Sequence, residues 1–119
     1  MTNVWIMRKM KGKDNRSVLV RADAITYLSG DDREVRASEL GSDEVVVLAD
    51  DMDGGRNAPL LPPDFHTDLI YAITQTRKNV RDATDAPDQE DRILMAQVED
   101  DCWVWKEFRP SEPSPKPTV

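Results

Sequence analysis

Cysteine and histidine are almost absent from the sequence, with Cys102 and His66 as the single representatives in 119 residues. One cysteine excludes an internal disulfide and fits a reducing cytoplasm. The two residues also fall short of the three or four nitrogen or sulfur ligands that a zinc site needs. A Cys–His nucleophile pair is formally available, but neither neighbourhood contains a nucleophile motif. We therefore expect no metal, no cofactor and no catalytic residue.

Long hydrophobic runs are missing as well. No apolar stretch approaches the ~18 residues that a membrane span needs, and residues 1–5 lack the charged-then-apolar plan of a secretory signal. The apolar fraction is 39% and the charged fraction is 33%, which suits a small soluble domain and argues against a wholly disordered chain. The sequence thus predicts a cytoplasmic protein without a membrane partner.

Common ligand-binding motifs are lacking too. Gly54 and Gly55 are not followed by the lysine and hydroxyl residue of a phosphate-binding loop. The acidic stretch 50–55 fits a calcium loop only in part, because Ala49 and Leu60 would occupy its first and last ligand positions. We therefore interpret this stretch as a flexible, solvated turn. The other carboxylates lie mostly in turns, so no catalytic acid–base pair is predicted.

Positive charge is scarce outside the N-terminal section. Residues 1–21 hold six cations against one acid, Asp14, and carry +5, so the remainder of a chain with net charge −7 carries −12. An acidic body opposes unspecific binding to nucleic acid or to anionic membranes. Aspartate outnumbers glutamate and arginine outnumbers lysine, a usage that we associate with high-GC bacteria and their phages. The order of elements predicted below, strands followed by a helix, also looks generically like that of many small accessory proteins of bacteria and phages.

Alternating apolar residues and intervening turn signals indicate short strands in the first half of the chain. The predicted strands cover residues 3–8, 17–21, 24–28, 34–38 and 44–49. Strands at such short intervals are typical of a small, antiparallel, curled sheet or barrel of four or five strands. The apolar residues of the last strand are continuous, so we expect it to be central and covered on both faces.

A helix is predicted over residues 64–81, where apolar residues recur at spacings of three and four. The stripe consists of Phe65, Leu69, Ile70, Ala72, Ile73, Thr76 and Val80. Pro63 suits the first helical position, where its missing N–H is not needed. This amphipathic helix would pack on the open face of the sheet.

Residues 92–108 allow two interpretations, a β-hairpin around residues 99–101 or a helix. The aromatic residues of its second half favour the hairpin. Residues 109–119 are rich in proline and predict an extended, disordered tail. The predicted fold is therefore α+β: a single domain over residues 1–108, followed by the tail.

The basic loop of the first hairpin, residues 8–16, is the best nucleic-acid candidate. A protruding β-ribbon with cations can follow phosphates, and a nearby aromatic ring can stack on a base. The candidate contacts are Trp5, Arg8, Lys9, Lys11, Lys13 and Arg16. A solvated hairpin tip that protects an edge strand from aggregation is the alternative. In a further interpretation, the acidic surface mimics the phosphates of DNA, and the protein thereby inhibits a nucleic-acid enzyme.

Tryptophan supplies the leading functional hypothesis. Trp103 and Trp105 alternate on one face of the last predicted strand, and Phe108 ends it. Tryptophan is enriched at interface centres, although two on one strand face are more often core residues. If the sheet cannot bury both, the remaining patch or the edge strand would bind another protein or a second copy of the chain, as a homodimer. We therefore predict a non-enzymatic interaction protein; an enzyme would need a ligand-sized polar pocket instead.

Overall fold

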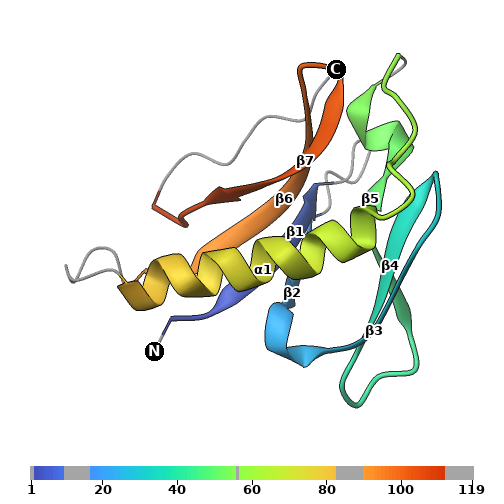
Figure 1. Cartoon of the computed structure of the whole chain (residues 1–119). Coiled ribbons are helices and arrows are strands. Elements are labelled where there is room, and N and C mark those ends of the chain that lie inside the picture. Colours follow the sequence, from blue (N-terminus) through green and yellow to red (C-terminus); the bar gives the residue numbers. More distant parts are fainter. Residues whose placement is uncertain (1, 10–16, 56, 83–89, 112–119) are drawn as a thin grey trace.

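The computed structural model of the chain describes residues 2–9, 17–55, 57–82 and 90–111 (Figure 1). These residues form seven strands, one α-helix and two short 3₁₀ helices. In chain order the elements are β1 (Val4–Lys9), β2 (Ser17–Arg21), η1 (Ala22–Ala24), β3 (Ile25–Gly30), β4 (Glu34–Glu39), β5 (Val45–Asp50), η2 (Asp51–Gly54), α1 (Phe65–Asp82), β6 (Arg92–Glu99) and β7 (Cys102–Phe108). The α+β class is confirmed.

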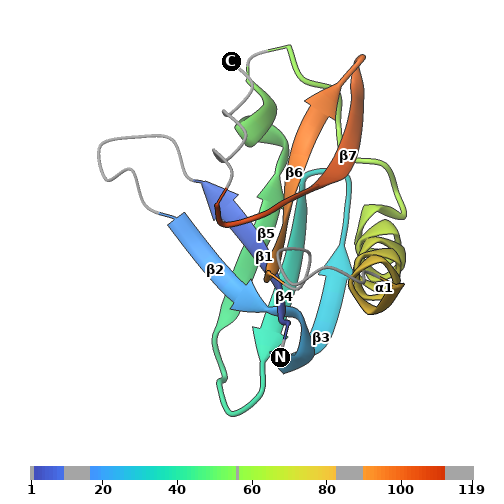
Figure 2. The same cartoon turned by 90° about the vertical axis from the view of Figure 1, so that its left-hand side faces the viewer.

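The strands lie in two sheets that do not close into a barrel (Figure 2). The first sheet has the order β2-β1-β6-β7 and the second has the order β3-β4-β5. β1 and β6 run parallel, with Trp5 opposite Ile93, whereas every other neighbouring pair is antiparallel. The sequence analysis placed residues 3–49 in one sheet. The structure divides them, because β1 and β2 join the C-terminal hairpin.

β5 lies at an edge of the second sheet, not at its centre as predicted. Val45 is 56% exposed, whereas Leu48 and Ala49 are fully buried. Only the second half of this apolar run therefore reaches the core. The valines in its first half favour strand formation without reaching the core, because β-branched residues prefer the pleated conformation even at half-exposed positions.

The C-terminal hairpin is confirmed in its strands and in its turn. β6 and β7 pair from Ile93 and Phe108 to Glu99 and Cys102 without a shift of register. Asp100 and Asp101 have φ angles of 51° and 62°, which are those of a two-residue type I′ turn. Aspartate tolerates this left-handed conformation better than most residues with a Cβ atom.

The helix α1 buries a narrower stripe than its sequence predicts. Phe65, Leu69, Thr76 and Val80 are buried, but Ile70 is 55% exposed. Successive residues of a helix are rotated by about 100°, so Ile70 turns away from the line on which Leu69 lies. The helix crosses the space between the two sheets and contacts both (Figure 1), and its two flanks remain accessible.

One hydrophobic core joins both sheets and the helix. Its fully buried residues come from β1, β4, β5 and α1 and include Ile6, Val35, Leu48 and Leu69. A second, smaller cluster of Ile93, Met95 and Phe108 lies on the other face of the first sheet. Among the residues that the structure describes, no helix has the length and apolarity that crossing a membrane requires. Most of the predicted tail, residues 112–119, lies outside the described residues.

Candidate interaction groove

The predicted interface residues divide between the two faces of the first sheet. Trp103 and Trp105 face the core, whereas Phe108 belongs to the cluster on the opposite face. Trp103 and Phe108 are each only 6% exposed, so they contribute to the interior and offer little surface to a partner. Trp105 is half-buried and borders a groove between α1 and β7.

Both tryptophans are fastened to the segment around the start of α1. The indole N–H of Trp103 donates to the carbonyl of Pro59 at 2.7 Å, and that of Trp105 donates to the carbonyl of Phe65 at 3.0 Å. The rings of Phe65 and Trp105 are stacked, with their centroids 4.7 Å apart and an interplanar angle of 14°. The carbonyl of Phe65 thus positions the indole of Trp105. Trp105 is therefore a rigid wall and not a free surface side chain.

The groove between α1 and β7 has a volume of about 390 Å³. Its apolar part is formed by Phe65, Ala72, Leu94 and Trp105. Tyr71, which is 67% exposed, stands on the helical side of the opening. A hollow with an apolar floor and an exposed aromatic residue at its rim is suited to binding part of another molecule.

The strand edge beside this groove has unpaired backbone groups. The tight turn makes Glu99 and Cys102 a hydrogen-bonded pair, so bonds to β6 recur at every second residue of β7. The backbone groups that point away from β6 are those of Trp103, Trp105 and Glu107. Over the described ranges, no other segment forms a hydrogen bond with them. β7 is therefore an open edge strand.

Polar and charged side chains line the rest of the groove. Gln75 and Asn79 come from α1, and the two carboxylates come from opposite walls, Asp68 on α1 and Glu107 on β7. Glu107 Oε2 lies 3.6 Å from Arg92 Nε, whereas the described residues place no cation within 4.0 Å of the Asp68 carboxylate. None of the described residues that line the groove is a lysine or an arginine. The groove is thus apolar at its floor and acidic at its walls.

A second hollow of about 230 Å³ lies on the other flank of the helix, between α1 and β3. It is lined by Ile25, Tyr27, Leu28, Ile70 and Ile73, among others, and no described residue of this lining is charged. β3 is also an edge strand, but its pairing with β4 shifts register between Ile25 and Tyr27. Such an irregularity interrupts the row of backbone groups that an added strand would use.

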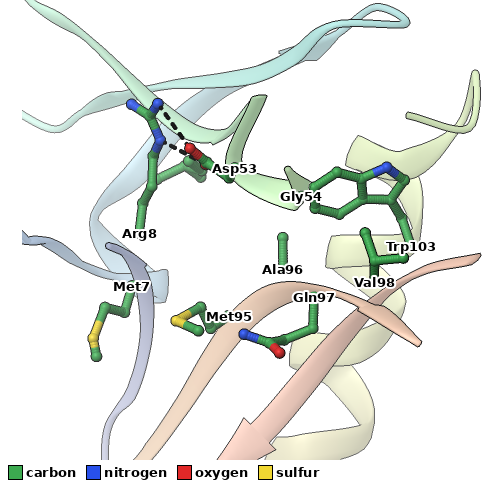
Figure 3. Close-up of a pocket in the computed structure, with 10 residues that line it drawn as sticks. Met7, Arg8, Asp53, Gly54, Met95, Ala96, Gln97, Val98 and Trp103 are labelled. Atoms are coloured by element: carbon green, nitrogen blue, oxygen red, sulfur yellow. Dashed lines mark hydrogen bonds and ion pairs between the residues drawn. The ribbon is translucent and has the colours of Figure 1, made fainter. Parts of the chain in front are cut away.

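Arg8, a predicted nucleic-acid contact, is engaged inside the protein. Its Nε lies 2.9 Å from Asp53 Oδ2 (Figure 3), and its Nη2 lies 3.8 Å from Asp50 Oδ2. The Arg8 side chain is 15% exposed. The acidic stretch that the sequence analysis interpreted as a flexible, solvated turn is therefore partly ordered, because η2 supplies the partner of a strand residue. The adjacent cavity of about 20 Å³ has room for one water molecule.

Trp5, the proposed base-stacking residue, is likewise held by the fold. Its indole N–H donates to Asp91 at 3.1 Å, and Asp91 also accepts the backbone N–H of Asn3 at 2.9 Å. These two donors, that of Asn3 first, lower the pKa of the Asp91 carboxyl below its ordinary value. The side chain of Lys9 and residues 10–16, with Lys11, Lys13 and Arg16, lie outside the described residues.

Sequence reasoning missed the helical wall of the groove. Asp68, Tyr71 and Gln75 are not part of the predicted apolar stripe of the helix. The one available signal was an aromatic residue, Tyr71, placed directly beside that stripe. Within the described ranges, no group of three or more His, Cys, Asp or Glu side chains could hold a metal ion. No family model, curated protein or solved structure matches this chain.

Proposed function

We propose that this protein is a non-enzymatic interaction protein that binds an extended segment of another protein in the groove between α1 and β7. The segment adds to the first sheet as a strand beside β7. The observation that carries this proposal is the unpaired edge of Trp103, Trp105 and Glu107 next to an apolar hollow. Addition of a strand to a free sheet edge is a recurring mode of peptide recognition.

The groove offers both components that this mode requires. The outward N–H and C=O groups of β7 bond to the backbone of the guest and so supply affinity that does not depend on sequence. Because side chains alternate along a strand, every second residue of the guest faces Trp105 and the helix. The buried ring of Phe65 stacks on Trp105 and so holds the half-buried indole as a rigid apolar surface for those side chains, of the kind found at interface centres.

Two comparisons within the molecule support this groove over other sites. β7 keeps its register with β6 over the whole hairpin, whereas the edge strand β3 contains an irregularity. Trp5 and Arg8, two of the predicted nucleic-acid contacts, already bind Asp91 and Asp53. The titratable side chains of the groove are those of Asp68, Tyr71 and Glu107, and we assign none of them a catalytic role.

A peptide selection tests the proposal. The full-length chain serves as bait for a displayed library of short random linear peptides, and Glu107→Pro and Glu107→Ala variants serve as parallel baits. Proline removes the outward N–H of residue 107 without removing a bond to β6, because that N–H points away from β6. Alanine removes the same carboxylate but keeps the N–H. We expect peptides that bind the native and alanine baits and lose at least about ten-fold in affinity on the proline bait, since more than one backbone bond is disturbed.

A second pair of variants tests the helical wall. Tyr71→Ala removes the aromatic ring from the rim of the groove, and Ile70→Ala truncates a side chain of the neighbouring hollow beside β3. We expect only Tyr71→Ala to weaken binding of the selected peptides. Circular dichroism and thermal melting confirm that each bait is folded. Peptides that bind all folded baits equally well, or no enrichment at all, would contradict the proposed site.

A further inference from the structure

The charges of the groove point to the chemistry of its guest. Two carboxylates, those of Asp68 and Glu107, face the groove from opposite walls, and the described part of the lining includes no cation. The whole chain carries a net charge of −7. An acidic guest would bring a like charge next to these groups in a hollow from which water is partly excluded, and such an arrangement opposes binding.

Asp68 is the carboxylate of the groove whose charge is most accessible to a partner from outside. It is exposed in the first turn of α1, where the helix dipole favours its negative charge. The described part of the chain supplies no salt bridge to it. Glu107, by contrast, lies near Arg92, although its side chain remains 33% exposed. On the helical side of the groove, the negative charge of Asp68 is therefore open to a cation of the guest. On the strand side, Arg92 partly balances the negative charge of Glu107.

We infer that the guest is a basic, apolar segment, in which an apolar side chain lies opposite Trp105 and a lysine or arginine follows two residues away, opposite Glu107. This inference rests on the proposed strand addition. Residues two apart on a strand share a face, and opposite charges on directly facing positions of adjacent strands attract each other. The same cation, or a second one on the helical side, lies within reach of Asp68 because lysine and arginine side chains are long and flexible.

Three synthetic peptides test the inference. In each, threonine alternates with valine, and one valine is replaced by lysine, glutamine or glutamate. Binding to isotope-labelled full-length protein is measured by NMR titration at low and at high salt. We expect the lysine peptide to bind about two- to five-fold more tightly than the glutamine peptide, as befits an ion pair at a groove rim, and the glutamate peptide to bind most weakly. The preference for lysine should shrink at high salt.

Matched variants separate a local charge effect from the general charge of the protein. The double variant Asp68→Asn/Glu107→Gln removes both groove carboxylates, and we expect it to bind the three peptides equally. The control Asp43→Asn/Glu44→Gln changes the net charge by the same amount in the exposed β4–β5 connection, which lines neither hollow. We expect this control to keep the order of the three peptides.

The outcomes distinguish this inference from the proposed function. If all three peptides bind the native protein equally but lose affinity for Glu107→Pro, the groove binds strands and the preference for a basic guest is wrong. If none binds the native protein better than Glu107→Pro, both the inference and the proposed function fail. If light scattering shows a native dimer that Glu107→Pro converts into a folded monomer, the guest is a second copy of the chain, and the inference is overturned.

Discussion

At the scale of single residues, two acidic side chains hold distant segments of the fold together. Asp53 holds Arg8 of β1 at 2.9 Å, and Asp91 holds the start of β1 through Asn3 and Trp5. Each of these contacts joins segments that are far apart in the sequence. Trp5 and Arg8, two of the six predicted nucleic-acid contacts, therefore have a structural role in the fold.

Replacement of Asp91 by alanine should lower the free energy of unfolding by about 1–2 kcal/mol at neutral pH, because two hydrogen bonds to a charged and partly exposed acceptor are lost. The pKa of Asp91 is lowered in the folded state. Its contribution is therefore present above the pKa of the unfolded state and is lost as the pH falls through the lower pKa of the folded state.

The difference in unfolding free energy between the native protein and Asp91→Ala should thus shrink below about pH 4. Chemical denaturation at a series of pH values measures it. Asp23→Ala is the control, because Asp23 forms an exposed pair with Arg21, and such pairs contribute little. An equal effect of both substitutions at neutral pH would show that Asp91 does not fasten β1.

At the scale of elements, the short helix η2 packs against the hairpin at a position where no side chain fits. A Cβ atom on Gly54 would lie 2.5 Å from the Cβ of Ala58 and 2.9 Å from the ring of Trp103. The absence of a side chain at Gly54 therefore lets η2 approach β7 and keeps Asp53 in reach of Arg8 (Figure 3).

Gly54→Ala should destabilise the protein by about 1–3 kcal/mol, the usual range for an overpacked core position. Gly54→Ala/Ala58→Gly removes the nearest clashing atom and should recover part of that loss, since residues in contact have coupled effects. Thermal or denaturant unfolding of the two variants measures the coupling. Additive losses in the double variant would mean that the contact with Ala58 is not what limits this site.

The helix and the strands were largely predictable from the sequence, but which of them pair or pack together in space was not. The strands, the helix and the β6–β7 hairpin follow from local alternation and turn residues, which act over a few positions. The parallel pairing of Trp5 with Ile93 joins residues from opposite ends of the chain, and no local pattern specifies it. Ile70 shows the same limit on a smaller scale. The apolar stripe of a helix does not indicate how much of its width the rest of the protein will cover.

The candidate site was predicted only in part, for a related reason. Trp105 was singled out for its residue type, but the wall opposite it, with Asp68 and Tyr71, comes from a helix whose placement depends on both sheets. The backbone edge of β7 has no sequence signal, since it depends on which strands pair, and among the described residues only β6 pairs with β7.

At the scale of the whole molecule, α1 crosses two sheets and leaves an edge strand on each of its flanks (Figure 1). The two flanks differ in chemistry: the hollow beside β3 is uncharged, and the groove beside β7 carries carboxylates. The acidic net charge of the chain would also speed the approach of a basic partner in a salt-dependent way. Shape, backbone and charge thus favour the same groove.

Amide hydrogen exchange on β7 tests strand addition most directly. In the free protein the amides of Val104 and Lys106 bond to β6 and should exchange slowly, whereas those of Trp103, Trp105 and Glu107 point outward and should exchange fast. Saturation with the peptide most enriched in the selection should slow the exchange of outward amides and so remove the alternation. If that peptide leaves these three amides unprotected, or protects residues beside β3 instead, β7 does not receive an added strand.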